Sequence, residues 1–120
     1  MGIRRAAVAL LLFVGAVGIL ACHNKQTIYT CRACLRDDAS RCQTYEGFCY
    51  GPNSHSMSAN SMDEAKQLAI RRVCSEWFEP VPSSGLQPQC KTGLGVPPAV
   101  LAETYSHYVF TCSSRVEKCP

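Results

Sequence analysis

The sequence predicts an α+β fold: a small disulfide-rich domain with a three-stranded antiparallel sheet packed by one main helix. Strand-like runs of β-branched and aromatic residues occur at 27–34, 41–50 and 105–112. A single amphipathic pattern, at 62–77, predicts the helix. Eight cysteines fall between residues 27 and 120, which is dense for a chain of 120 residues. We therefore expect one disulfide-stapled domain over 27–120.

The first two strands are predicted to form a hairpin. Alternation along 27–34 (TIYTCRAC) places three side chains on one face: Tyr29, Cys31 and Ala33. Asp37 and Asp38 then mark a polar turn. The segment 41–50 (RCQTYEGFCY) returns as the second strand, in which Gly47 is expected to mark a bulge.

The helix has the clearest local signals. Ser61 and Glu64 form a capping box, in which Glu64 is expected to reach back to the amide of Ser61. Pro80 ends the helix. Its apolar stripe consists of Met62, Ala65, Ala69, Val73 and Trp77, widened by Leu68, Ile70 and Cys74.

The rest of the domain is predicted from composition. A long loop rich in proline and glycine covers 79–98, with Cys90 pinning it down. A helical turn is expected at 98–103, because proline suits a first helical position. The third strand follows at 105–112, and 113–120 is expected to be a tail anchored by Cys119.

The N-terminus predicts export. A short basic head, with Arg4 and Arg5, precedes an unbroken apolar run at 6–21. A membrane-spanning helix needs about 20 apolar residues, and this run is shorter. Residues 1–21 are therefore predicted to be a signal peptide.

The end of this segment resembles the lipobox of bacterial lipoproteins. Ile19, Ala21 and Cys22 match its pattern, whereas Leu20 departs from the small or β-branched residue that is commoner there. The resemblance implies a diacylglycerol on the Cys22 sulfur, a tether at 22–26, and attachment to a membrane. His23 follows the cysteine where aspartate commonly retains lipoproteins in the inner membrane, so the resemblance favours the outer membrane.

The odd number of cysteines also favours lipid attachment at Cys22. An exported protein meets an oxidising compartment, and nine cysteines leave one over. If Cys22 carries lipid, eight remain for four disulfides: Cys31, Cys34, Cys42, Cys49, Cys74, Cys90, Cys112 and Cys119. The alternative is ordinary cleavage after Gly18, which gives a secreted or periplasmic domain with one extra thiol.

The chemistry-bearing residues favour structural roles. Cys31 and Cys34 form a C-x-x-C, but a strand rather than a helix follows it, and no second C-x-x-C completes a zinc site. On opposite faces of a strand they would not pair with each other; Cys31 with Cys74 is one pairing that the layout allows. The histidines (His23, His55 and His107) lack metal-ligand spacing, and His107 is expected on a strand face with Tyr105 and Val109. We expect no metal and no cofactor.

The charge balance and the absence of known motifs argue against two classes of function, nucleic-acid binding and catalysis. Removing Arg4 and Arg5 leaves ten basic against nine acidic residues without a basic patch, which argues against nucleic-acid binding. No polybasic run adjoins Cys22 either; only Lys25 is near. No glycine-rich phosphate loop or nucleophile elbow occurs, and Ser83, Ser84 and Gly85 have no recognisable base. We therefore expect no enzyme.

The aromatic residues provide the candidate binding surface. Five tyrosines fall on the proposed strands: Tyr29, Tyr45, Tyr50, Tyr105 and Tyr108. Alternation turns some of them away from the helix, so either an aromatic sheet face is exposed to bind protein, peptide or glycan, or the long loop covers it. We predict a lipid-anchored binding or interaction module of the bacterial envelope. The alternatives are a structural or inhibitory accessory protein and a thiol oxidoreductase using Cys31 and Cys34.

Overall fold

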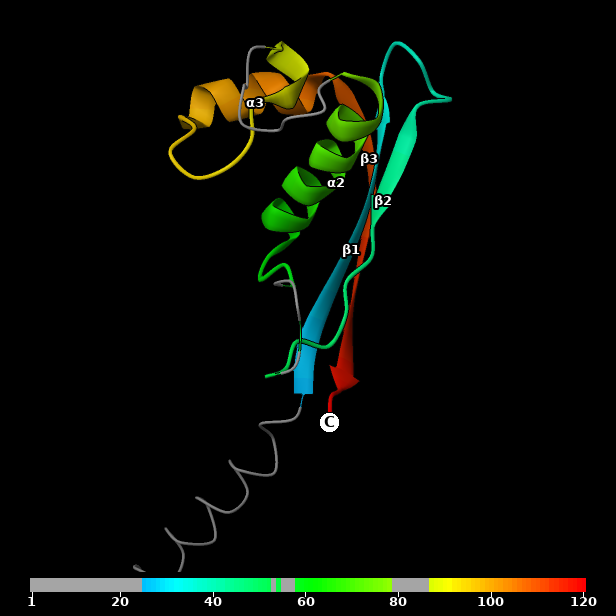
Figure 1. The fold of residues 1–120 in the computed structure, drawn as a ribbon, viewed down its shortest axis with the longest axis vertical. Coiled ribbons are helices and arrows are strands. Elements are labelled where there is room, and N and C mark those ends of the chain that lie inside the picture. The colour runs from blue at the N-terminus through cyan, green and yellow to red at the C-terminus, as the bar shows by residue number, and fades with distance from the viewer. Residues whose placement is uncertain (1–24, 53, 55–57, 79–86) are drawn as a thin grey trace, which may run out of the picture.

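The computed structural model describes residues 25–52, 54, 58–78 and 87–120. It has a three-stranded antiparallel sheet with helices against one face (Figure 1), which confirms the predicted α+β class. The strands are β1 (Lys25–Leu35), β2 (Cys42–Tyr45) and β3 (Tyr108–Lys118). The helices are α2 (Met62–Trp77), the 3-10 turn η3 (Pro88–Cys90) and α3 (Pro98–Ser106). The predicted signal peptide and Cys22 lie outside the described residues.

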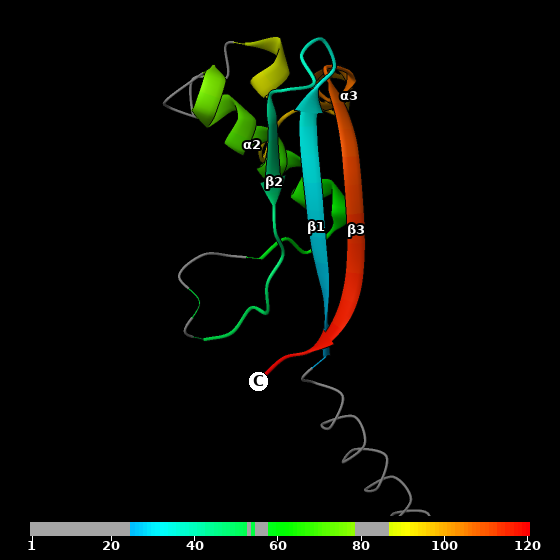
Figure 2. The same ribbon diagram turned by 90° about the vertical axis from the view of Figure 1, so that its right-hand side faces the viewer.

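The first and last strands form the longest pair in the sheet. The strand order is β2-β1-β3, and β1 pairs with β3 along its whole length, from Lys25 opposite Lys118 to Leu35 opposite Tyr108. Both ends of the described chain therefore lie at one end of the molecule, which Figures 1 and 2 show at the lower end of the sheet. We call this the base of the sheet.

The helix α2 spans the residues that the sequence predicts. The Ser61 hydroxyl accepts a hydrogen bond from the Glu64 amide at 3.1 Å. The Glu64 carboxylate reaches back to the Asn60 amide at 2.7 Å instead of the Ser61 amide, one residue earlier than expected. Small residues on its buried stripe let the helix approach the sheet closely: Ala65 and Ala69 lie beside Ile70, Val73 and Cys74.

The second strand is shorter than predicted. It ends at Tyr45 rather than at residue 50. Beyond it, the Gly47 amide donates to the hydroxyl of Thr30 at 3.1 Å rather than to a backbone carbonyl, so the sheet ladder is not continued. A Cβ on Gly47 would collide with the Tyr29 carbonyl oxygen and the Ile28 side chain. Gly47 therefore permits a close approach after the strand rather than a bulge within it.

The third strand is displaced from the prediction. The helical turn expected at 98–103 extends to Ser106, so Tyr105 lies in α3 and His107 caps it. The strand then runs from Tyr108 to Lys118 and takes in most of the segment expected to be a tail. His107 does not share a strand face with Tyr105 and Val109. The pairing with β1 explains the extra length, because it satisfies the backbone of 113–118.

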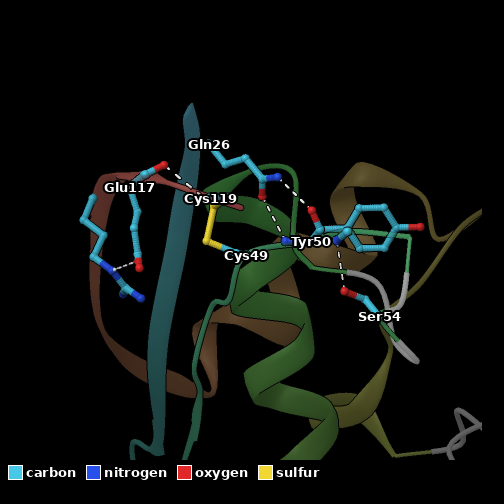
Figure 3. Close-up of a disulfide and its surroundings, with 8 residues drawn as sticks. Gln26, Cys49, Tyr50, Ser54, Glu117 and Cys119 are labelled. Atoms are coloured by element: carbon cyan, nitrogen blue, oxygen red, sulfur yellow. Dashed lines mark hydrogen bonds and ion pairs between the residues drawn. A yellow bond between two sulfur atoms is a disulfide. The ribbon is translucent and has the colours of Figure 1, made fainter. Parts of the chain in front are cut away.

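All eight cysteines of the domain are paired, in four disulfides. Cys31–Cys112 and Cys34–Cys42 join residues that are directly opposite in the sheet. Cys49–Cys119 ties the segment after β2 to the end of β3 (Figure 3). Cys74–Cys90 pins η3, within the predicted long loop, to α2. The pairing of Cys31 with Cys74 is therefore wrong, whereas the expectation that Cys31 and Cys34 do not pair with each other is confirmed.

Candidate interaction surface

The five tyrosines do not form a common exposed face. Tyr45 is 5 % exposed and Tyr108 is 1 % exposed, so neither can contact a partner. Tyr29 and Tyr105 are half-buried and pack against the core beneath α2. Tyr50 alone is exposed, at 48 %. The predicted aromatic surface is therefore wrong for Tyr45 and Tyr108, because the register turns these rings toward the helices.

Each of the two buried tyrosines holds a neighbouring segment in place through a hydrogen bond of its hydroxyl. The Tyr108 hydroxyl donates to the carbonyl oxygen of Gln89 at 2.6 Å, which holds η3 against the sheet. The Tyr45 hydroxyl accepts a hydrogen bond from the Ala59 amide at 2.7 Å and so fixes the segment before α2. Burial raises the pKa of the Tyr108 phenol, which keeps it a protonated donor.

A third tyrosine joins the two helices. The Tyr105 hydroxyl donates to a carboxylate oxygen of Asp63 at 2.6 Å. Burial, followed by the bond to Asp63, raises the pKa of Tyr105. The Lys66 ammonium lies 5.8 Å from the Tyr105 ring centroid and 5.3 Å from that of Phe110. These contacts tie α3 and β3 to the start of α2, so the cluster has a structural use.

Figure 2 looks onto the face of the sheet that is turned away from the helices. Directly opposite residues in an antiparallel pair share a face, so Arg32 lies with Thr111, and Thr30 with Ser113. Thr111 and Ser113 are exposed, and Val109 beside them is 49 % exposed. We call this side the outer face. It carries hydroxyl and guanidinium groups, where the sequence predicted either aromatic rings or a covering loop.

The sequence missed this surface for a local reason. Ser113 lies in the segment that was expected to be a tail, and Thr111 stands at the end of the predicted strand. The alternation of Val109, Thr111, Ser113 and Arg115 on one face is visible in the sequence once the strand is extended to Lys118.

A cleft of about 570 Å³ lies at the opposite end from the base, between the turn after β1 and the end of α3. Three of its charged side chains bond to one another or to nearby groups of the chain: Arg36, Asp38 and Arg41. The Arg36 guanidinium donates to the carbonyl oxygens of Ser106 and Tyr108, both at 3.0 Å. Hydrogen bonds from the Ser40 hydroxyl and amide lower the pKa of Asp38, which also pairs with Arg41 at 3.2 Å. Asp38 thus stabilises a turn, as adjacent acids in turns commonly do.

The C-x-x-C has no redox geometry in this fold. Cys31 is fully buried and bonded to Cys112, while Cys34 is bonded to Cys42. The two sulfurs belong to different disulfides on opposite faces of β1. Within the described part of the chain, no three histidine, cysteine or acidic side chains come together as metal ligands.

His23, His55, Ser83, Ser84 and Gly85 lie outside the described residues. In the ranges that the structure does describe, no helix combines the length and hydropathy needed to cross a bilayer.

No protein-family model matches the chain, no curated protein is detectably similar to it, and no solved structure is detectably similar to it.

Proposed function

We propose that this protein is a lipid-anchored component of the bacterial cell envelope, held by acylated Cys22, that acts as an interaction module. The observation that carries the proposal is the pairing of the cysteines. The eight cysteines of the domain bond to one another, so none is left to pair with Cys22. An acyl group on that sulfur accounts for the odd cysteine, and the lipobox-like sequence before it supplies the processing signal.

The uncovered outer face supports the interaction role. It is stiffened by Cys34–Cys42 within the sheet, and its exposed residues include Arg32, Thr111 and Ser113. A rigid polar face loses little conformational entropy on binding, which favours recognition of a protein or glycan surface. The disulfide arrangement gives no support to the alternative of a thiol oxidoreductase.

Acylation is tested by the intact mass of the full chain expressed with export in a Gram-negative host. The expected mature protein begins at Cys22, carries the mass of a diacylglycerol and a third acyl chain, and reacts with no alkylating agent before reduction. The matched variant is Cys22→Ser, which should lose the lipid and leave the membrane fraction. A chain that begins at Ile19, without acyl mass and with one alkylatable thiol, would contradict the proposal.

The interaction role is tested by photo-crosslinking in cells. A photoreactive residue replaces Thr111 on the outer face, and Glu76, which is exposed on α2, is the control position. A discrete crosslinked product at 111, absent at 76 and removed by Ser113→Arg, is expected. If both positions give the same background, the protein is better described by the alternative of a structural accessory protein.

A further inference from the structure

The base of the sheet brings two lysines together. Lys25 and Lys118 stand directly opposite each other in the β1–β3 register, and both are exposed. Neither forms an ion pair with any described residue, whereas the nearby Arg115 is paired with Glu117 at 3.0 Å. Like charges that face each other across two strands destabilise a sheet. The pair therefore does not stabilise the sheet, and it gives this end of the domain two exposed ammonium groups that an anionic partner could contact.

The same end is held rigid and presents an aromatic ring. The Gln26 side chain donates to the carbonyl oxygen of Tyr50 at 2.7 Å and accepts from the Tyr50 amide at 2.9 Å (Figure 3). The adjacent Cys49–Cys119 disulfide crosses to the end of β3. These bonds fix Tyr50 beside the start of β1 with 48 % of its surface exposed. A ring with a polar hydroxyl suits the interface of a membrane.

The length of the chain before β1 places this end close to the anchor. Lys25 comes three residues after Cys22, and three residues span at most about 11 Å. The Debye length at physiological ionic strength is about 8 Å. Lys25, and Lys118 opposite it, are thus held within about one to two screening lengths of the lipid that carries Cys22.

We infer that the base of the sheet, through Lys25, Lys118 and Tyr50, is a docking surface for a bilayer that contains anionic lipids. This inference rests on the proposed anchoring at Cys22. Docking orients the domain with its long strands rising from the membrane, so that the outer face is open to the side and the distant cleft lies at the end away from the membrane. Each lysine near an anionic leaflet strengthens association about fivefold.

The experiment anchors the protein without relying on cellular acylation. The oxidised chain that begins at Cys22 has one reactive thiol, because the other eight sulfurs are in disulfides, and this thiol is coupled to a maleimide lipid in vesicles. The vesicles contain phosphatidylcholine alone or with phosphatidylglycerol, and a trace lipid carries a nitroxide quencher on its headgroup. Tyr50→Trp adds a fluorophore at the base. The parent protein keeps only Trp77, which lies about 22 Å along α2 from its first residue.

The indole introduced by Tyr50→Trp should be quenched in vesicles with phosphatidylglycerol and less so in those without it, while Trp77 in the parent stays bright in both. Reversing both lysines, with Lys25→Glu and Lys118→Glu, should reduce the ratio of docked to undocked protein by at least about 25-fold. The matched control carries Arg71→Glu and Arg72→Glu, which make the same charge change at exposed positions of α2 away from the base and should leave the quenching unchanged.

The inference would be wrong if quenching were the same with and without phosphatidylglycerol, or if it fell equally in the lysine variant and in the arginine control. The two proposals fail separately. An unacylated Cys22 in cells removes the anchoring but leaves the vesicle result in place, and a freely tumbling domain on vesicles removes the docking surface while the acyl mass stands.

Discussion

The hydroxyl of Tyr108 lies 2.6 Å from the carbonyl oxygen of Gln89, and this bond joins the start of β3 to η3. Tyr108 is 1 % exposed, so water cannot replace the bond. Tyr108→Phe removes the donor and leaves the carbonyl without this partner. We expect the free energy of unfolding to fall by about 1–3 kcal/mol in urea denaturation. Tyr50→Phe removes a hydroxyl from an exposed ring and should change it by less than about 0.5 kcal/mol. An equal change in the free energy of unfolding for both variants would contradict a stabilising role for the hydrogen bond between Tyr108 and Gln89.

The raised pKa values of Tyr105 and Tyr108 predict a loss of stability in alkali. An acid whose pKa is higher in the folded state than in the unfolded state stabilises the fold fully below the unfolded pKa, which is about 10 for tyrosine. Above it, the unfolded chain releases protons that the folded chain retains, so stability falls as pH rises. Denaturation from about pH 8 to about pH 11 should show this fall. The double variant Tyr105→Phe and Tyr108→Phe should show a smaller slope; an unchanged slope would assign the effect to other groups.

Gly47 and Gly51 make a matched pair for the close approach after β2. A Cβ at Gly47 would meet the Tyr29 carbonyl oxygen and the Ile28 side chain, whereas one at Gly51 would meet nothing within 4 Å. Gly47→Ala should lower the free energy of unfolding by about 1–3 kcal/mol, as overpacking does. Gly51→Ala should be neutral or stabilise by up to about 1 kcal/mol, since it restricts the unfolded chain. Thermal unfolding of the two variants checks the difference, and a neutral Gly47→Ala would refute the contact.

The two cross-strand disulfides should differ in what they contribute. Cys31–Cys112 closes a loop with a sequence separation of 81, and Cys34–Cys42 closes one of 8. The other bridges stay intact in each variant and shorten the first loop to about 20 residues, so the loop entropy of the unfolded chain predicts about 3 kcal/mol for the first and about 2.5 kcal/mol for the second. Replacing each pair by alanines and comparing denaturant midpoints with the slope held fixed tests the order. A larger loss from the Cys34–Cys42 pair would be inconsistent with loop closure as the cause.

How far the sequence predicts this fold depends on where each signal is encoded. The helix at Met62–Trp77 was predicted to the residue, because Ser61 and the apolar stripe are local signals. The third strand was misplaced because its limits depend on a distant partner. Tyrosine is a residue type that favours strands, yet the helix that begins at Pro98 continues through Tyr105. Residues 113–118 form a strand only because they pair with β1.

The surfaces were harder to predict than the elements. The sequence predicts that Tyr45 and Tyr108 lie in strands, and both do. The face that each ring takes depends on the register, however, and a shift of one residue would turn the ring to the opposite face. The basic pair at the base is not apparent from the sequence, because Lys25 and Lys118 are separated by almost the whole domain and only the β1–β3 register brings them together. The cysteine pattern predicted that four bridges exist but left their pairing open among 105 arrangements.

The order in which the cysteines are joined has a consequence for biogenesis. A chain that is threaded through a membrane from its N-terminus exposes its thiols one after another, and an oxidant that linked neighbours as they emerged would join Cys31 to Cys34. Of the four bridges made in that way, only Cys74–Cys90 is native. The correct set requires the last strand, which carries Cys112, and the Cys119 that follows it. If the chain is exported as we propose, the native set can be completed only after Cys112 and Cys119 have crossed the membrane, and any bond formed earlier between neighbours would have to be exchanged.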